Sequence, residues 1–319
     1  MREYGPMEGD PLKLRYVTKP RPSRGHVIVK VSARGACHTD LHVMEKELEP
    51  RALPIIPGHQ VVGIVEEIGS GVKNLKSGDR VGVTWVNSNC GTCEFCASER
   101  ENLCKSMRFT GYDINGGFAE YVTVSQDFAF KVPEKFDDVH AAPLFCAGII
   151  GYRALRLSGI TRGSTLAIFG FGASGHIMAQ IAKHWDCRFI AFTRGSEHKH
   201  LAESLGADWV GDVSDEPPFR ADAAVITAPA GELVIEALKK TKKGCRIAIE
   251  DIYMSQILAI DYNKYLYHER WLGSVTNYTR DDAKEFLRPA AEMPIVTHVE
   301  KFPLEIANDA LNLMKRGRI

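Results

Sequence analysis

Four cysteines lie close together in the sequence at positions that suit a metal ion: Cys90, Cys93, Cys96 and Cys104. Four thiolates at this spacing can surround one tetrahedral ion, and sulfur donors favour zinc. All four coordination positions would then be filled by protein, so we expect a structural zinc site. The alternative is a set of unpaired or disulfide-bonded cysteines, but half of the chain's eight cysteines lie in this one segment.

The spacing Cys-x2-Cys-x2-Cys-x7-Cys resembles the structural zinc lobe of zinc-dependent medium-chain alcohol dehydrogenases. That family also has a catalytic zinc, and its motifs occur here in the family's order: Cys37-His38-Thr39-Asp40-Leu41-His42, Pro57-Gly58-His59-Gln60 and Phe145-Cys146-Ala147. The resemblance covers nearly the whole chain and implies that Cys37, His59 and Cys146 bind this second ion. Three protein ligands leave one position open, as in catalytic zinc sites. Taken singly, each residue could be an ordinary core cysteine or a hydrogen-bonded histidine.

The same resemblance assigns roles to residues that follow Cys37. Asp40 would accept a hydrogen bond from the ring of His59 and fix its tautomer. Thr39 would be the first member of a proton relay that carries the proton of the substrate alcohol outward, and His42 would deliver this proton to solvent. The alternatives are a plain loop aspartate at Asp40 and a plain surface histidine at His42.

Length, composition and charge narrow the class of partner. The chain has 319 residues, a length that allows two domains, each with its own core. Its residues are 45% hydrophobic and 25% charged, which is ordinary for a soluble protein. Its formal net charge is zero and its charges form no long runs, so we expect neither nucleic acid nor an acidic membrane surface as a partner, but a small neutral molecule. The first ten residues lack the apolar core of a signal peptide, and no apolar stretch reaches eighteen residues. Together with thiols arranged as metal ligands, these features predict a cytoplasmic protein.

The order of strands and helices predicts an α/β protein with two domains. Short strands punctuated by glycine, such as 26–32 and 61–68, predict a mostly-β, barrel-like domain that is similar to the GroES-like catalytic domain of the family. Strands and helices alternate from about residue 149, which predicts a doubly wound Rossmann domain. The family's tail returns to the first domain, so we expect a catalytic domain at 1–148 and 277–319 and a cofactor-binding domain at 149–276. Both ends look short, because the family pattern has a further strand before Tyr4 and another after Arg318 that this sequence does not show.

A glycine-rich turn lies between the expected strand 165–169 and the expected helix 177–184. In a dinucleotide-binding unit, Gly170 would form the tight turn, Gly172 would let the backbone approach the pyrophosphate, and Gly175 would let the helix pack on the strand. An ordinary turn is the alternative, but the flanking strand and helix favour dinucleotide binding.

Two residues after the next expected strand bear on the choice between NAD and NADP. About 20 residues beyond the glycine motif, an NAD-binding enzyme would place an acid for the ribose hydroxyls, whereas this chain has Thr193 and Arg194. A threonine and an arginine can bind a 2′-phosphate, so NADP is favoured and NAD stays open. The resemblance also places His38 where the family often has a cation that faces the pyrophosphate.

Together these features predict an NAD(P)-dependent zinc alcohol dehydrogenase with two zinc ions per chain. It would interconvert small or medium primary alcohols and aldehydes by hydride transfer, and it would be a homodimer or homotetramer. One alternative is a polyol or other secondary-alcohol dehydrogenase on the same scaffold, and another is a non-catalytic zinc- and nucleotide-binding relative. Two positions depart from the family: Gln60 replaces a usual glutamate, and Ile150 replaces a threonine that commonly contacts the nicotinamide. Trp85 is expected either at the wall of the substrate pocket or in the core.

Overall fold

The chain divides into two compact units in a computed structural model that describes residues 2–4, 11–51 and 53–317. The first unit comprises Met1–Cys146, Thr279–Ala291 and Thr297–Ile319, and the second comprises Ala147–Tyr278 and Glu292–Val296. The first unit therefore takes its residues from both ends of the chain. The domain limits expected from the sequence stay a prediction. Arg318 lies outside the described residues.

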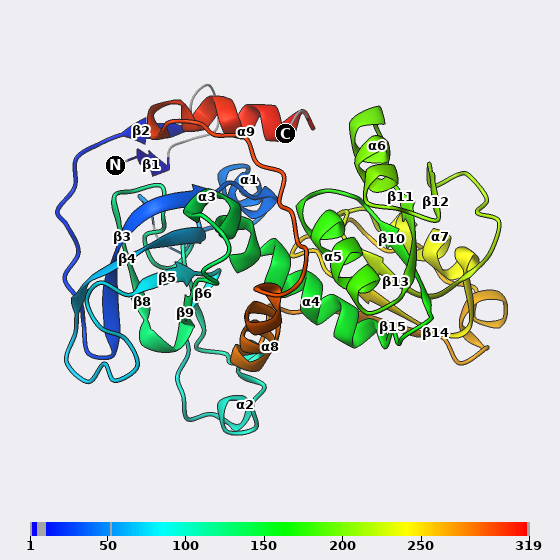
Figure 1. The fold of residues 1–319 in the computed structure, drawn as a ribbon, viewed down its shortest axis with the longest axis horizontal. Helices are drawn as coiled ribbons and strands as arrows, with labels where there is room; N and C mark the ends of the chain where they lie inside the picture. Colours follow the sequence, from blue (N-terminus) through cyan, green and yellow to red (C-terminus); the bar gives the residue numbers. More distant parts are fainter. Residues whose placement is uncertain (1, 5–10, 52, 318–319) are drawn as a thin grey trace. The chain divides into compact units, whose positions relative to one another are not determined.

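The first unit is built on a five-stranded antiparallel sheet with the order β8-β3-β4-β5-β9 (Figure 1). Its strands are β3 (His26–Gly35), β4 (Gln60–Ile68), β5 (Arg80–Val83), β8 (Tyr121–Ser125) and β9 (Ala129–Lys131). Two short antiparallel pairs accompany it: β1 (Arg2–Tyr4) with β2 (Leu12–Leu14), and β6 (Val86–Ser88) with β7 (Arg108–Phe109). Val27, Val29 and Val65 are fully buried, so the apolar positions of the expected strands do form the core.

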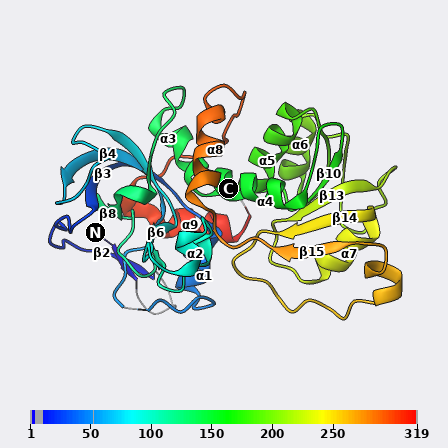
Figure 2. The ribbon, with the colours of Figure 1, turned by 90° about the horizontal axis from the view of Figure 1, so that it is seen from below.

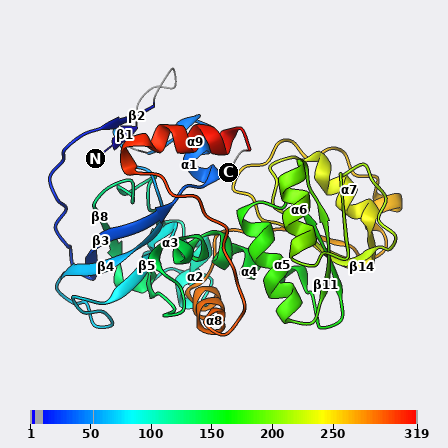
Figure 3. The same ribbon diagram turned by 45° about the horizontal axis from the view of Figure 1, so that its top comes forward.

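Short helices complete the first unit. They are α1 (His38–Met44), α2 (Glu94–Ala97), η1 (Glu101–Leu103), η2 (Gln126–Phe128), α3 (Asp138–Ala141), η3 (Ala142–Phe145), α8 (Arg280–Ala290), η5 (Leu304–Ile306) and α9 (Ala307–Lys315). Helix α9, near the end of the chain, lies beside α1 (Figure 3). Leu41 and Met44 of α1 share one buried cluster with Leu311 and Met314 of α9. The tail of the chain therefore covers the apolar face of α1.

The second unit contains a six-stranded parallel sheet with the order β12-β11-β10-β13-β14-β15. Its strands are β10 (Thr165–Phe169), β11 (Arg188–Phe192), β12 (Trp209–Gly211), β13 (Ala221–Ile226), β14 (Thr241–Ile249) and β15 (Trp271–Ser274). Numbered within this unit, the order is 3-2-1-4-5-6, which is that of a dinucleotide-binding Rossmann fold. All five residues of the central strand β10 are buried, as expected for a strand with both faces covered.

Helices cover both faces of this parallel sheet. Figure 2 shows α4 (Ala147–Ser158), α5 (Ala173–His184) and α6 (Ser196–Ser204) on one side and α7 (Glu232–Lys240) on the other. One turn of π-helix, η4 (Tyr262–Leu266), precedes β15. The sequence pattern predicts helix starts at Ile150, Ile177 and Lys199, but α4, α5 and α6 begin three or four residues earlier. Their first turns contain glycine or polar residues that do not show apolar periodicity.

A close contact in the first unit links the sheet to the segment that precedes Cys146. Gly82 of β5 has no side chain, and the fully buried ring of Phe145 fills the space. A Cβ added at Gly82 would lie 2.2 Å from two atoms of that ring. The positions of Phe145 and of the adjacent Cys146 therefore depend on a glycine at position 82.

We expect Gly82→Ala to lower the free energy of unfolding by roughly 1–3 kcal/mol, because the methyl group overfills a packed core. Urea unfolding followed by circular dichroism measures this change. Phe145→Leu in the same background removes ring atoms from the collision and should recover part of the loss. If the double variant recovers nothing, the cost of Gly82→Ala does not come from this contact.

Candidate active site

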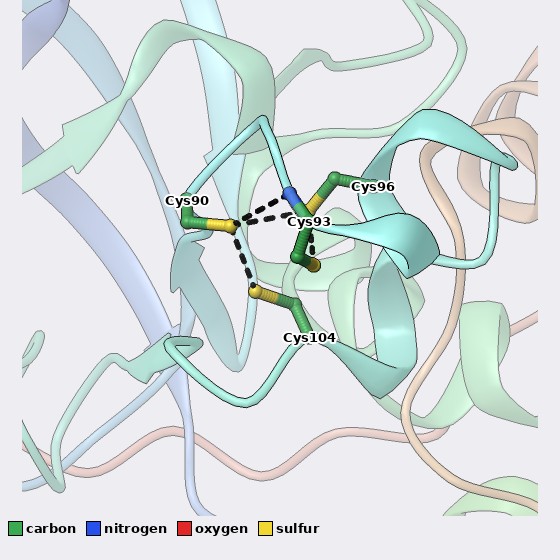
Figure 4. A group of neighbouring side chains, drawn as sticks. All are labelled: Cys90, Cys93, Cys96 and Cys104. Carbon is green, nitrogen blue, oxygen red and sulfur yellow. Dashed lines mark hydrogen bonds between the residues drawn. The ribbon is translucent and has the colours of Figure 1, made fainter.

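The four cysteines of the expected structural site are brought together (Figure 4). The Sγ–Sγ distances are 3.8 Å for Cys90–Cys96, 3.5 Å for Cys93–Cys96 and 3.6 Å for Cys90–Cys104. Four sulfur ligands of a tetrahedral zinc ion, each about 2.3 Å from the metal, lie about 3.8 Å apart. The donor set and its spacing therefore fit zinc.

The backbone of the lobe prepares Cys90 to act as a ligand. The Cys93 N–H group donates to the Cys90 sulfur at 3.4 Å, and hydrogen bonds from the backbone of Thr92 and Cys93 lower the pKa of Cys90 to about 6. A lowered pKa favours the thiolate, which is the form that binds zinc.

A buried ion pair anchors this lobe to α8. Glu101 is 2% exposed, and its Oε1 accepts hydrogen bonds from the backbone N–H and the Nε of Arg280, at 2.7 and 3.0 Å. A buried carboxylate without such partners would cost several kcal/mol. The cysteine lobe is therefore held by a contact that does not involve its sulfur atoms.

A second cluster joins the three residues expected at the catalytic zinc. Cys37 precedes α1, His59 precedes β4, and Cys146 follows η3, yet their ligand atoms all lie within 4.8 Å of one another. His59 is 1% exposed, and its Nε2 lies 3.3 Å from the Cys146 sulfur. Nitrogen and sulfur ligands of a tetrahedral zinc ion lie about 3.6 Å apart, so this donor set also fits zinc.

Asp40 lies behind this second cluster. Its Oδ2 accepts a hydrogen bond from the Cys37 N–H at 2.9 Å, and its Oδ1 accepts one from the Gly58 N–H at 3.1 Å. Its Oδ1 also lies 3.6 Å from the His59 Nδ1, which is beyond hydrogen-bond distance but close enough for a charge interaction. Burial acts to lower the pKa of His59, but Asp40 and Cys37 outweigh it and raise that pKa to about 10. The surroundings of the His59 ring therefore favour a positive charge at this position.

The two expected relay residues lie on α1 and are buried. The Thr39 hydroxyl oxygen lies 3.7 Å from the Cys37 sulfur. His42 is 6% exposed, so the alternative of a plain surface histidine is wrong. Its Nδ1 contacts Glu47, a residue that the sequence reasoning missed. His38, at the first position of α1, is exposed.

An aromatic cluster contacts His59 through Trp85. Trp85 is 9% exposed, its ring centroid lies 5.1 Å from that of His59, and its ring stacks on Phe109 at 4.9 Å. Tyr112 lies 5.8 Å from Trp85. Trp85 is thus both a core residue and a neighbour of the ligand cluster. Phe109 and Tyr112 were missed because no motif marks them in the sequence.

The glycine turn of the second unit has the geometry that dinucleotide binding requires. Gly170 has a φ of +101°, and a Cβ at Gly175 would lie 2.5 Å from the Gly170 carbonyl oxygen. A Cβ at Gly172, in contrast, would meet no described atom within 4 Å. Close packing therefore requires glycine at positions 170 and 175, whereas Gly172 leaves open space directly before α5. A helix N-terminus with open space is suited to bind a phosphate.

Thr193 and Arg194 follow β11 beside this turn. The Gly170 N–H donates to the Phe192 carbonyl at 2.9 Å, which joins the ends of β10 and β11. Thr193 is buried, and Arg194 is exposed. Within the described part of the chain, Arg194 has no ion-pair partner, so its guanidinium is available to a ligand.

Known proteins match this chain over its full length. The profile of the alcohol dehydrogenase GroES-like domain matches residues 23–134. The "Probable alcohol dehydrogenase AdhA" of Mycobacterium tuberculosis (strain CDC 1551 / Oshkosh) is 41% identical, with 100% of this chain and 94% of that protein covered, and an alcohol dehydrogenase of Geobacillus stearothermophilus is 37% identical, with 97% and 94% covered. A cinnamyl alcohol dehydrogenase structure from Sorghum bicolor superimposes with a TM-score of 0.91 at 26% identity, covering 99% of this chain and 94% of that one.

The chain belongs to the zinc-dependent medium-chain alcohol dehydrogenase family. The expected fold class, a GroES-like catalytic domain with a Rossmann domain, is confirmed. The prediction of an NAD(P)-dependent alcohol dehydrogenase is confirmed as well. Among the described residues, none of the helices has the length and apolar character needed to cross a membrane.

We expect Asp40→Asn to weaken zinc retention by roughly 10- to 100-fold, because the amide keeps only one accepting oxygen, so one of the two hydrogen bonds from Cys37 and Gly58 is lost. Metal analysis after dialysis against increasing concentrations of a chelator measures this effect. Glu45→Gln, a loss of charge directly after the same helix, is the control and should retain zinc as the unchanged chain does. Equal retention by both variants would contradict the role given to Asp40.

Proposed function

We propose that this alcohol dehydrogenase interconverts small or medium primary alcohols and aldehydes at a zinc ion held by Cys37, His59 and Cys146. The observation that carries this proposal is the convergence of these three donors from distant segments, with the buried carboxylate of Asp40 behind them. When bound, zinc would supply Lewis acidity at the substrate oxygen. A second zinc ion, held by Cys90, Cys93, Cys96 and Cys104, is structural in this proposal because its four ligands are all protein sulfurs.

The residues of the chain would handle the proton and exclude water. The Thr39 hydroxyl, buried beside Cys37, takes the proton that leaves the alcohol and passes it toward His42 on the same helix. Asp40 holds the His59 ring in place for metal binding. Trp85 forms an apolar wall beside His59 that favours a short apolar substrate.

The second unit would bind the dinucleotide, with NADP favoured over NAD. Gly170, Gly172 and Gly175 shape the turn that approaches the pyrophosphate, and the N-terminus of α5 faces it. Thr193 and the exposed Arg194 offer a hydroxyl and a guanidinium to a 2′-phosphate. His38 is proposed as a further contact to the pyrophosphate.

We further propose that the chain is a cytoplasmic homodimer or homotetramer. Strand β15 is an edge of the parallel sheet, and its Trp271 is 62% exposed. An edge strand with an exposed aromatic residue is suited to pair with another copy. The cytoplasmic assignment depends on thiols arranged as metal ligands, which agree with a reducing compartment.

The decisive experiment measures NADH and NADPH oxidation against a panel of primary aldehydes, ketones and polyol-derived substrates, with zinc counted per chain. We expect turnover of primary aldehydes and two zinc ions. Cys146→Ser should abolish turnover with the fold retained, whereas Cys93→Ser should chiefly lower the melting temperature. Preference for ketones would favour the secondary-alcohol alternative. One zinc ion in a fully active, metal-saturated preparation would contradict the structural site.

We expect Arg194→Ala to weaken NADPH binding by roughly tenfold to a hundredfold and to leave NADH binding nearly unchanged, because only NADPH has a 2′-phosphate for the guanidinium. Fluorescence titration with each cofactor measures the two affinities. Arg162→Ala, an exposed arginine of the same unit that pairs with Asp186, is the control. Equal losses for both cofactors would refute the NADP assignment.

A further inference from the structure

The chain reverses direction directly after α1. The last helical residue is Met44, and Lys46 has a φ of +59°, which lies in the left-handed region. The Lys46 N–H donates to the Val43 carbonyl at 3.3 Å, and the Leu48 N–H donates to the His42 carbonyl at 3.0 Å. This turn carries residue 47 back toward the ring of His42, which lies on the last turn of the helix.

Glu47 uses this turn to contact His42. Its Oε2 lies 2.5 Å from the His42 Nδ1, and the side chains of His42 and Glu47 are 8% and 35% exposed. A carboxylate at this distance is an acceptor for the Nδ1–H group of an imidazole, and it leaves Nε2 as the nitrogen that can take up a proton. The contact therefore selects one of the two tautomers of His42.

The other charged groups near this turn pair with other residues or are exposed to solvent. Glu45 pairs with Lys315 of α9, and Arg51 pairs with Asp113 from the loop after β7. The side chain of Lys46 is exposed, and the Tyr112 hydroxyl donates to the backbone carbonyl of Glu49. Glu47, in contrast, contacts the His42 ring directly.

We propose that Glu47 is a positioning residue of the proton relay. It holds His42 in the Nδ1–H tautomer, so that Nε2 accepts the proton that leaves the alcohol through Thr39, and its negative charge stabilises the imidazolium that results. The ring gains one proton at Nε2 and releases one to water after each oxidation, so Glu47 itself is unchanged. This inference depends on the relay role of His42 in the proposed function.

Glu47→Gln in the zinc-loaded, full-length enzyme tests this role, with Glu47→Asp and Glu49→Gln beside it. We expect Glu47→Gln to lower kcat for alcohol oxidation by about 10- to 100-fold with little change in KM or zinc content, as for other residues that orient a functional histidine. Glu47→Asp keeps the carboxylate and should recover much of kcat. Glu49→Gln removes the same charge from the same segment and should behave as the unchanged enzyme.

A second readout separates positioning from a purely structural contact. At constant pH and ionic strength, increasing concentrations of a small amine buffer should raise kcat of Glu47→Gln and leave the unchanged enzyme nearly constant, because an external base replaces a relay that has lost its orientation. An unchanged kcat in Glu47→Gln would overturn the proposal, and so would a loss that follows the melting temperature and ignores the buffer.

His42→Gln, measured in parallel, distinguishes the two levels of inference. If His42→Gln loses activity and recovers with buffer while Glu47→Gln is fully active, the relay stands and the role of Glu47 is refuted. If His42→Gln is fully active, the relay itself is refuted, and the role of Glu47 falls with it. Neither result bears on the zinc ligands, which the metal analysis tests separately.

Discussion

The arrangement of the first unit around its candidate zinc site depends on the hydrogen bonds of one buried carboxylate. Asp40 accepts the backbone N–H groups of Cys37 and Gly58, and these two residues belong to segments that are far apart in the sequence. Because Asp40 is 2% exposed, its charge has to be satisfied by these partners. The bond to Cys37 also caps the first turn of α1, so the same carboxylate sets the start of this helix and the position of the His59 loop.

Helix α1 shows why a chain of this kind needs its tail. Seven residues form too short a helix to be stable alone, and its stability has to come from packing. Leu311 and Met314 of α9 supply that packing against Leu41 and Met44. The position of α1, which carries His42, thus depends on residues that lie about 270 positions later in the chain. The discontinuity of the first unit is, in this sense, a requirement of the helix that carries Thr39 and His42.

Local sequence patterns predicted the features that are themselves local. The spacing of Cys90 to Cys104 and the turn from Gly170 to Gly175 each lie within fifteen residues, and the structure brings the expected residues together. The separate motifs of Cys37, His59 and Cys146 required the family resemblance, because no local pattern joins them. Glu47 could not be predicted, since its contact depends on the left-handed conformation of Lys46, a residue type that rarely marks such a turn. The starts of α4, α5 and α6 were predicted late because apolar periodicity begins only after the first turn.

The two metal-ligand clusters differ in what surrounds them, and this difference follows from their chemistry. Four thiolates complete a coordination shell by themselves, so the lobe of Cys90 to Cys104 needs only an attachment, which the pair of Glu101 and Arg280 provides. In the proposed function, three donors leave a position for a substrate, so the second cluster must also manage a proton. Its neighbours are accordingly the carboxylate of Asp40, the hydroxyl of Thr39 and the imidazole of His42 on one helix, and the ring of Trp85.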